Sequence, residues 1–175
     1  LTEFIPDKPM IKLQYWIKTG RKLNLKNPER FTEKLQWYKL YYRDPLMTRC
    51  ADKYKVRDYV ISKGYEDILV PLYGVYNKVE EIEFDELPNK FVLKTTNGSR
   101  TNLICKDKAK LDIEDTKKTL NEWLIKRTNK AGREWPYYNI INRIIGEQYL
   151  EKDKNNDLVD YKFMCFEGKV ACVFV

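Results

Sequence analysis

The fold is decided by the stretch Phe91-Val-Leu-Lys-Thr-Thr-Asn-Gly-Ser-Arg-Thr-Asn-Leu-Ile-Cys-Lys-Asp-Lys108. It predicts an apolar strand that carries a lysine, a short loop of small residues, and a second strand. Because side chains alternate along a strand, Lys94 lies on the opposite face from Phe91 and Leu93. A lysine beside such a loop can bind a polyphosphate through its ammonium group, with the loop N–H groups closing over the phosphates. The alternative is a lysine that extends from an exposed sheet face into solvent.

Composition limits the chemistry. The chain has 175 residues, enough for one domain or most of one, and because it starts at Leu1 and stops at Val175 in an apolar run we expect a segment of a longer protein. The net charge is +7 and there is no histidine, which excludes histidine acid–base catalysis and most zinc sites. The basic balance favours an anionic partner, or simply a solvated lysine-rich surface.

The four cysteines show no Cys-x-x-Cys spacing and lie in mostly apolar surroundings. They are therefore expected to be buried, reduced thiols, which indicates a reducing compartment. No apolar run is long enough to span a bilayer and no signal peptide is visible, so we expect a cytoplasmic protein. The cysteines are Cys50, Cys105, Cys165 and Cys172.

Hydrophobic periodicity predicts helices before strands, with one helix between strands. This order is typical of an α+β fold with a largely antiparallel sheet. Pro71 favours an edge position for the first strand. The expected helices cover residues 9–18, 31–42, 45–62 and 112–127, and the expected strands cover residues 68–76, 91–96 and 143–150, with a hairpin over 159–175 that turns at 167–168.

Three further segments carry candidate chemistry, each with a simpler alternative. Asp52-Lys53 is expected to begin a helix segment, where the helix dipole favours an anion, or it is ordinary helix-end charge. Glu147-Gln148-Tyr149-Leu150 ends a strand and can hold an adenine edge and a ribose, or it is a strand with a polar end. Asp160 and Lys162 share one face of the hairpin, as the polar end of a cleft wall or as a surface ion pair.

In this order the features resemble the ATP-grasp fold. More narrowly, the chain is similar to the TupA-like branch of ATP-grasp proteins, found among bacterial cell-surface polysaccharide genes. The resemblance covers almost the whole chain. It rests on Asn27-Pro-Glu-Arg-Phe-Thr-Glu-Lys-Leu-Gln-Trp37, Asp52-Lys-Tyr54, Phe91-Val-Leu-Lys94, Arg133-Glu-Trp-Pro-Tyr137, Arg143-Ile-Ile145, Glu147, Tyr149-Leu150 and Asp160-Tyr-Lys-Phe163.

The resemblance implies an ATP site. Lys53 and Lys94 would bind phosphates, and the Lys-strand, loop and following strand would form a phosphate flap. The flap loop would be Asn97, Gly98, Ser99, Arg100 and Thr101, while Glu147, Gln148, Tyr149 and Leu150 would hold adenine and ribose. Lys162, with Asp160, would face the terminal phosphate or an acyl-phosphate intermediate.

It also implies an organisation: a helical part at 1–50, the ATP-grasp small subdomain at 51–145, and the start of the second subdomain at 146–175. The Mg²⁺ ligands of such enzymes are expected beyond Val175, so no residue here is assigned to the metal.

The loop departs from the family pattern. Relatives usually have a histidine before the Gly-Ser pair and a glycine after it, whereas this chain has Asn97 and Arg100. Losing a glycine restricts positive φ angles. Arg100 can instead offer its guanidinium to phosphate oxygens. This departure from the family pattern puts the catalytic competence of the protein in question, more than its fold.

The leading hypothesis is an ATP-dependent carboxylate-amine ligase in surface-polysaccharide assembly, acting on an acidic saccharide or an amino-acid-like substrate. Such a protein would associate peripherally with the membrane-bound machinery of glycan assembly. The first alternative is a glycosyltransferase, although the Asp-x-Asp motif common in metal-dependent members is absent. The second is a non-catalytic module for an anionic ligand; nucleic acid is not expected, because the basic residues are dispersed among acids.

Overall fold

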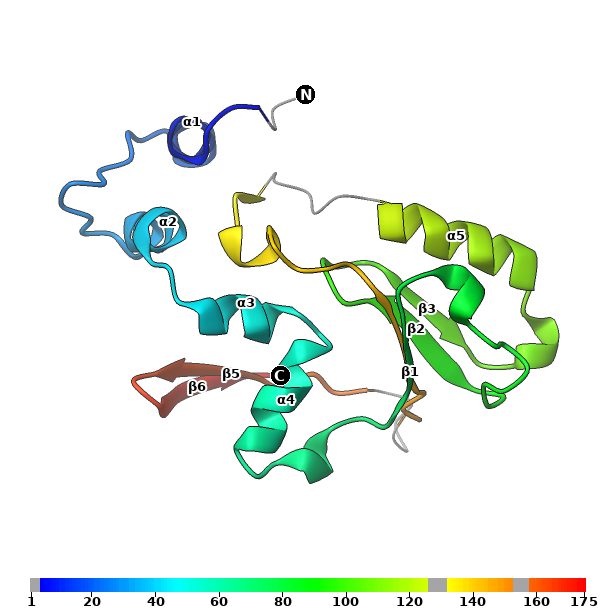
Figure 1. Cartoon of the computed structure of the whole chain (residues 1–175). Coiled ribbons are helices and arrows are strands. Elements are labelled where there is room, and N and C mark those ends of the chain that lie inside the picture. Colours follow the sequence, from blue (N-terminus) through cyan, green and yellow to red (C-terminus); the bar gives the residue numbers. More distant parts are fainter. Residues whose placement is uncertain (1–3, 126–131, 153–157) are drawn as a thin grey trace.

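The computed structural model describes residues 4–125, 132–152 and 158–175. It has helices and antiparallel sheets, which confirms the α+β class (Figure 1). The α-helices are α1 (Asp7–Thr19), α2 (Phe31–Tyr41), α3 (Pro45–Ala51), α4 (Lys55–Ser62) and α5 (Ile113–Ile125). The strands are β1 (Leu72–Tyr76), β2 (Phe91–Thr95), β3 (Asn102–Cys105), β4 (Ile144–Gln148), β5 (Lys162–Phe166) and β6 (Lys169–Phe174).

A four-stranded antiparallel sheet in the order β1-β4-β2-β3 is the centre of the structure. β1 is an edge strand, as Pro71 predicts. In the register of β2 and β4, Val92 lies opposite Glu147 and Lys94 lies opposite Ile145. Lys94 and Glu147 are therefore diagonal neighbours on one face of the sheet, within reach of long side chains.

The other face of the sheet holds the main hydrophobic core, covered by α5 (Figure 1). Phe91, Leu93 and Ile144 from the strands and Leu120 from α5 are fully buried there. Along β2 the buried residues alternate with half-buried ones, as the sequence pattern predicts. The predicted end of the α5 helix at Arg127 lies outside the described residues.

The predicted continuous helix over residues 45–62 is wrong. Asp52 has an extended backbone (φ −80°, ψ 113°), which separates α3 from α4. Its buried carboxylate accepts hydrogen bonds from the N–H groups of Tyr54 (2.9 Å) and Lys55 (3.1 Å), and so satisfies donors at the start of α4. The neighbouring Lys53 N–H donates to the Thr96 carbonyl at 3.1 Å. The break thus joins the start of α4 to the end of β2.

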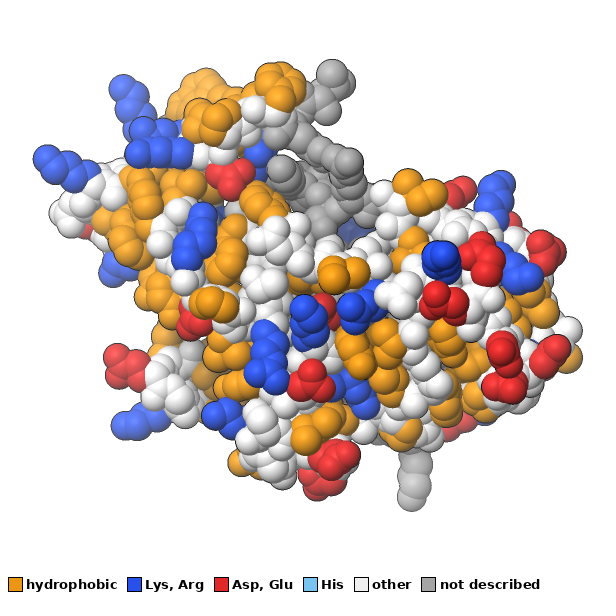
Figure 2. Space-filling model, in the orientation of Figure 1, with side chains coloured by type: hydrophobic (Ala, Val, Ile, Leu, Met, Phe, Trp, Pro, Cys, Tyr) orange, Lys and Arg blue, Asp and Glu red, His pale blue; other side chains and the backbone are white. Residues whose placement is uncertain are grey.

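The N-terminal helices agree with the prediction to within two residues at each end. α1 ends at Gly20, whose φ of 68° is the left-handed conformation that glycine adopts readily. Trp16, Phe31 and Tyr38 remain exposed, and Figure 2 shows apolar side chains gathered over α1 and α2.

Side-chain hydrogen bonds connect the start of α1 to residues 133–138. The buried Arg133 donates from Nη1 to the Ile5 carbonyl (2.9 Å) and to the Asp7 carboxylate (3.1 Å). The Tyr138 hydroxyl donates to the same carboxylate at 3.2 Å. Burial and the charge of Asp7 raise the pKa of Tyr138 to about 12, so this hydroxyl keeps its proton at neutral pH.

The prediction of four buried thiols is wrong for three of them. All four cysteines are free, but only Cys105 is buried, and burial raises the pKa of its thiol. Cys165 and Cys172 lie on β5 and β6, which form the predicted hairpin and are exposed along their whole length. Apolar sequence neighbours do not bury a residue on a two-stranded hairpin unless another element packs on it.

The predicted boundary between residues 145 and 146 falls inside β4, which pairs with both β1 and β2. The division of the chain into three parts remains a prediction.

Replacing Leu93 with alanine tests the core. The side chain is fully buried, so we expect the free energy of unfolding to fall by about 2–5 kcal/mol. Ile104→Ala on β3 is the control; its side chain is 57% exposed, and we expect a change below about 1 kcal/mol. Urea unfolding followed by circular dichroism measures both. Equal losses in the two variants would contradict the described core.

Candidate functional site

Lys53 and Lys94, far apart in the sequence, lie close together. Lys53 lies two residues before the start of α4 and is half-buried, and its Nζ donates to the Gly98 carbonyl at 2.7 Å. Burial and the nearby charge of Lys94 lower the pKa of Lys53, while the charges of Asp52 and Glu147 act in the opposite direction. Two ammonium groups that repel each other in a partly buried site form an arrangement typical of anion binding.

Glu147 holds these cations in place. Its buried carboxylate pairs with Lys94 and, at 3.7 Å, with Arg57 of α4. Arg57 also donates to the Val70 carbonyl at 2.8 Å, at the approach to β1. Three cations (Lys53, Lys94, Arg57) against two carboxylates (Glu147, Asp52) leave a formal charge of +1. The cluster therefore attracts an anion even though Glu147 occupies part of it.

The loop between β2 and β3 has a fixed base. The Thr95 hydroxyl donates to the Asn97 carbonyl at 2.6 Å and shares a 2.5 Å hydrogen bond with the Thr101 hydroxyl. The Thr96 hydroxyl donates to the Ile141 carbonyl and accepts from the Arg143 N–H, both at 3.0 Å. Buried hydroxyls thus anchor both ends of the loop, as small polar residues in this stretch can do.

The tip of the loop is open to solvent. Gly98, Ser99 and Arg100 are exposed, and Gly98 and Arg100 have φ angles of 82° and 63°. Arg100 thus occupies the left-handed region that its Cβ disfavours, at a cost of roughly 1–2 kcal/mol. The glycine-to-arginine departure therefore keeps the turn and adds local strain.

The predicted adenine segment runs along and beyond the end of β4. The Gln148 N–H donates to the Pro71 carbonyl at 3.0 Å. Tyr149 and Leu150 follow the strand, and the Lys90 ammonium lies 5.8 Å from the Tyr149 ring centroid. Only the first member of the segment, Glu147, joins the lysine cluster by its side chain.

Lys162 and Asp160 do not join the cluster. The two side chains are exposed and form an ion pair with each other. Within the described residues, no hydrogen bond or ion pair connects either one to Lys53, Lys94 or Glu147. Their assignment to the site remains a prediction.

Two arginines complete the surroundings. Arg57 pairs with Glu147 through space, and its position one turn into a helix gives no sign in the sequence of the carboxylate it contacts. Arg143 was noted only as part of the resemblance, before an apolar strand. Its guanidinium lies 5.6 Å from the ring centroid of Tyr54, the residue after Lys53, and its buried Nε has no hydrogen-bond partner among the described residues.

Residues that could hold a magnesium ion are not grouped here. Among the described residues, no set of three or more acidic or cysteine side chains lies together in a way that suits a metal. The carboxylates of Glu147 and Asp52 are used by lysine, arginine and backbone N–H groups. No described residue is therefore assigned as a metal ligand.

The lowered pKa of Lys53 gives a first test. At pH 8–9 a lower pKa leaves more of the reactive neutral amine, and Lys94→Met removes the repulsion that contributes to the shift. We expect the pH midpoint for acetylation of Lys53 to rise in this variant. Peptide mass spectrometry after brief treatment with acetic anhydride measures the rate against pH, with the exposed Lys63 as the reference. An unchanged midpoint would show that the two ammonium groups do not interact.

Comparison with known proteins identifies the family of the chain. The family model described as TupA-like ATPgrasp matches residues 33–175, which include the lysine cluster, the loop and the hairpin. No curated protein and no solved structure matches the chain. Because the matched region covers most of the sequence, the chain belongs to the TupA-like ATP-grasp family.

Proposed function

We propose that this protein binds ATP with its phosphates at Lys53 and Lys94 and acts as a carboxylate-amine ligase. The observation that carries the proposal is the pair of mutually repelling, half-buried lysines beside a loop anchored by threonines. A polyphosphate relieves this repulsion and accepts charge-assisted hydrogen bonds from both ammonium groups. Family membership supports the choice of ATP over other polyanions.

The proposed reaction has two steps. A carboxylate oxygen of an acidic saccharide or an amino-acid-like substrate bonds to the γ-phosphorus, the bond to the β–γ bridging oxygen breaks, and ADP leaves. An amine then bonds to the acyl carbon, phosphate leaves, and the amine loses a proton. Lysines contribute by neutralising and aligning the phosphates, which supplies most of the catalysis in phosphoryl transfer.

The other assignments are parts of the same proposal. N–H groups of Asn97, Gly98 and Ser99 would meet phosphate oxygens, and their exposed loop tip leaves room for this. Gln148, Tyr149 and Leu150 would lie along the base and ribose. Lys162, with Asp160, and Arg100 would act at the terminal phosphate; their exposure leaves the two cations accessible to a ligand.

A role in bacterial cell-surface polysaccharide assembly is proposed from the resemblance. Exposed aromatic side chains on α1 and α2, next to lysines such as Lys8, which lies 5.8 Å from the Tyr41 ring centroid, support peripheral contact with membrane-bound glycan assembly. Across the described part of the chain, no helix combines the length and apolar character that crossing a bilayer requires.

Removing the Lys94 ammonium tests the phosphate site. We expect Lys94→Met to weaken ATP binding by about 10–100-fold, the loss of one or two hydrogen bonds to a charged group. Lys53→Met should act similarly and leaves the Lys94–Glu147 pair intact. The control is Lys106→Met, an exposed lysine after β3. Calorimetry gives the affinities and circular dichroism checks folding; wild-type affinity in both folded variants would rule out the site.

Product analysis distinguishes the three functions. We expect sustained release of ADP and phosphate from ATP only when an acidic saccharide or amino acid and an amine are both present. Release of UDP from a UDP-sugar, with no ATP turnover, would favour a glycosyltransferase. Salt-dependent binding of polyanions without turnover of either nucleotide would favour a binding module.

A further inference from the structure

A basic cavity lies among α3, the start of α4 and a 3₁₀-helix. It has a volume of about 580 Å³ and lies where α3 packs against the 3₁₀-helix η5 (Trp135–Tyr137) and meets the start of α4. This volume is within the range of about 300–1,000 Å³ typical of small-molecule sites. We name it the Trp135 pocket; its lining includes Arg43, Thr48, Arg49, Lys55, Trp135 and Asn139.

The cations of the Trp135 pocket are not neutralised. Among the described residues, no carboxylate lies within ion-pair distance of Arg43, Arg49 or Lys55. Asp58 is the one acidic residue of the lining, so three cations and one carboxylate leave a formal charge of +2. Figure 2 shows Lys and Arg side chains gathered where the α3–α4 region meets the sheet.

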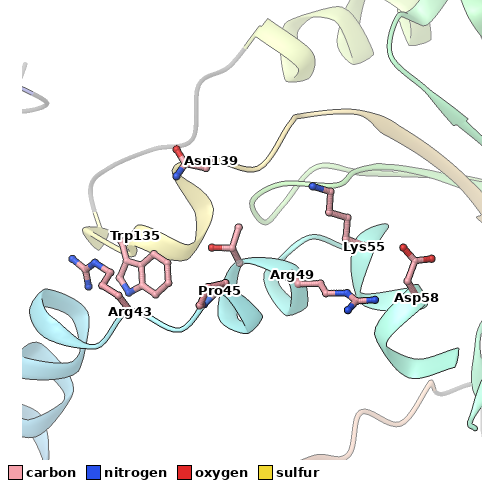
Figure 3. A pocket seen from close by; sticks show the side chains of 8 residues that line it. Arg43, Pro45, Arg49, Lys55, Asp58, Trp135 and Asn139 are labelled. Atoms are coloured by element: carbon pink, nitrogen blue, oxygen red, sulfur yellow. The ribbon is translucent and has the colours of Figure 1, made fainter. Parts of the chain in front are cut away.

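The pocket also has a flat aromatic wall. The half-buried Trp135 ring lies 4.8 Å from the Arg43 guanidinium carbon, and Arg43 is held by donating to the carbonyls of Lys39 (3.0 Å) and Tyr42 (2.9 Å). Figure 3 shows Arg43 and Trp135 at one end of the pocket and Arg49, Lys55 and Asp58 at the other. The indole beside Arg43 at one end, and the pair of cations Arg49 and Lys55 beside Asp58 at the other, suit a ring that carries an acid group.

The pocket and the proposed phosphate site share the segment that begins α4. Lys55, which lines the pocket, lies two residues after Lys53, and both follow the helix break at Asp52. On the opposite side, the Asn97 side-chain amide donates to the Tyr137 carbonyl at 3.5 Å, which connects the loop to η5. The α4 start and η5, which both contribute to the pocket, are thus also connected to Lys53 and to the loop.

We propose that the Trp135 pocket binds a ring-shaped anion, with its acid group at Arg49 and Lys55 and its ring against Trp135. The assignment of the pocket as the site of the acidic co-substrate rests on the proposed ligase function. The proposal that the pocket binds an anion does not depend on that function.

Titration with defined small molecules tests the pocket. We expect D-glucuronate or glucose 1-phosphate to bind at least about tenfold more tightly than neutral glucose, and the tighter of the two identifies the preferred acid group. Arg49→Gln and Lys55→Gln should each weaken that binding about tenfold and leave ATP affinity within about twofold. The matched control is Lys63→Gln, because Lys63 and Arg49 both face the Tyr59 ring but only Arg49 lines the pocket.

The outcomes separate the two proposals. Equal affinity for glucose and both anions, or equal weakening by Lys63→Gln and Arg49→Gln, would overturn the pocket assignment. Anion binding that responds to Arg49 and Lys55 in a protein that binds no ATP would support the pocket and contradict the ligase.

Discussion

The arrangement of the candidate site depends on the buried carboxylate of Glu147. It pairs with Lys94 on β2 and with Arg57 on α4, and Glu147 itself belongs to β4, so one side chain joins three elements. Breaking a buried ion pair by removing one partner typically costs about 3–5 kcal/mol, because the remaining charge stays buried without compensation. The two strands and the helix therefore keep the relative positions that hold Lys94 beside Lys53.

This constraint leaves Lys53 in an unfavourable position. Its ammonium donates to the Gly98 carbonyl rather than to a carboxylate, and burial together with the charge of Lys94 lowers its pKa. An unfavourable position of this kind persists only where the surrounding structure fixes it. Here the backbone hydrogen bond from the Lys53 N–H to the Thr96 carbonyl and the capping carboxylate of Asp52 hold Lys53 in place. An anion relieves the repulsion from Lys94, which links the architecture to the proposed binding of phosphates.

Local patterns predicted the elements well and their boundaries less well. The alternation in Phe91 to Thr95, the stop at Gly20 and the hairpin turn at Gly168 are each confirmed, because each depends on neighbours within a few residues. Helical spacing continues through Asp52, so periodicity alone predicts one helix over residues 45–62, although Asp52-Lys53 is also expected to begin a helix segment. In the structure the buried carboxylate of Asp52 ends α3 and caps α4. Exposure of Cys165 was missed because burial depends on what packs against the hairpin.

The sequence by itself determined the α+β class, the strand that carries Lys94, the small-residue loop and the resemblance to the ATP-grasp family, since these are matters of period, turn chemistry and motif. Only the tertiary structure decided that Lys53 and Lys94 meet, that Glu147 pairs with both Lys94 and Arg57, and that Lys162 pairs with Asp160. The physical reason is that charge contacts act through space: strand register and the break before α4 select the partners, and neither is visible in local periodicity.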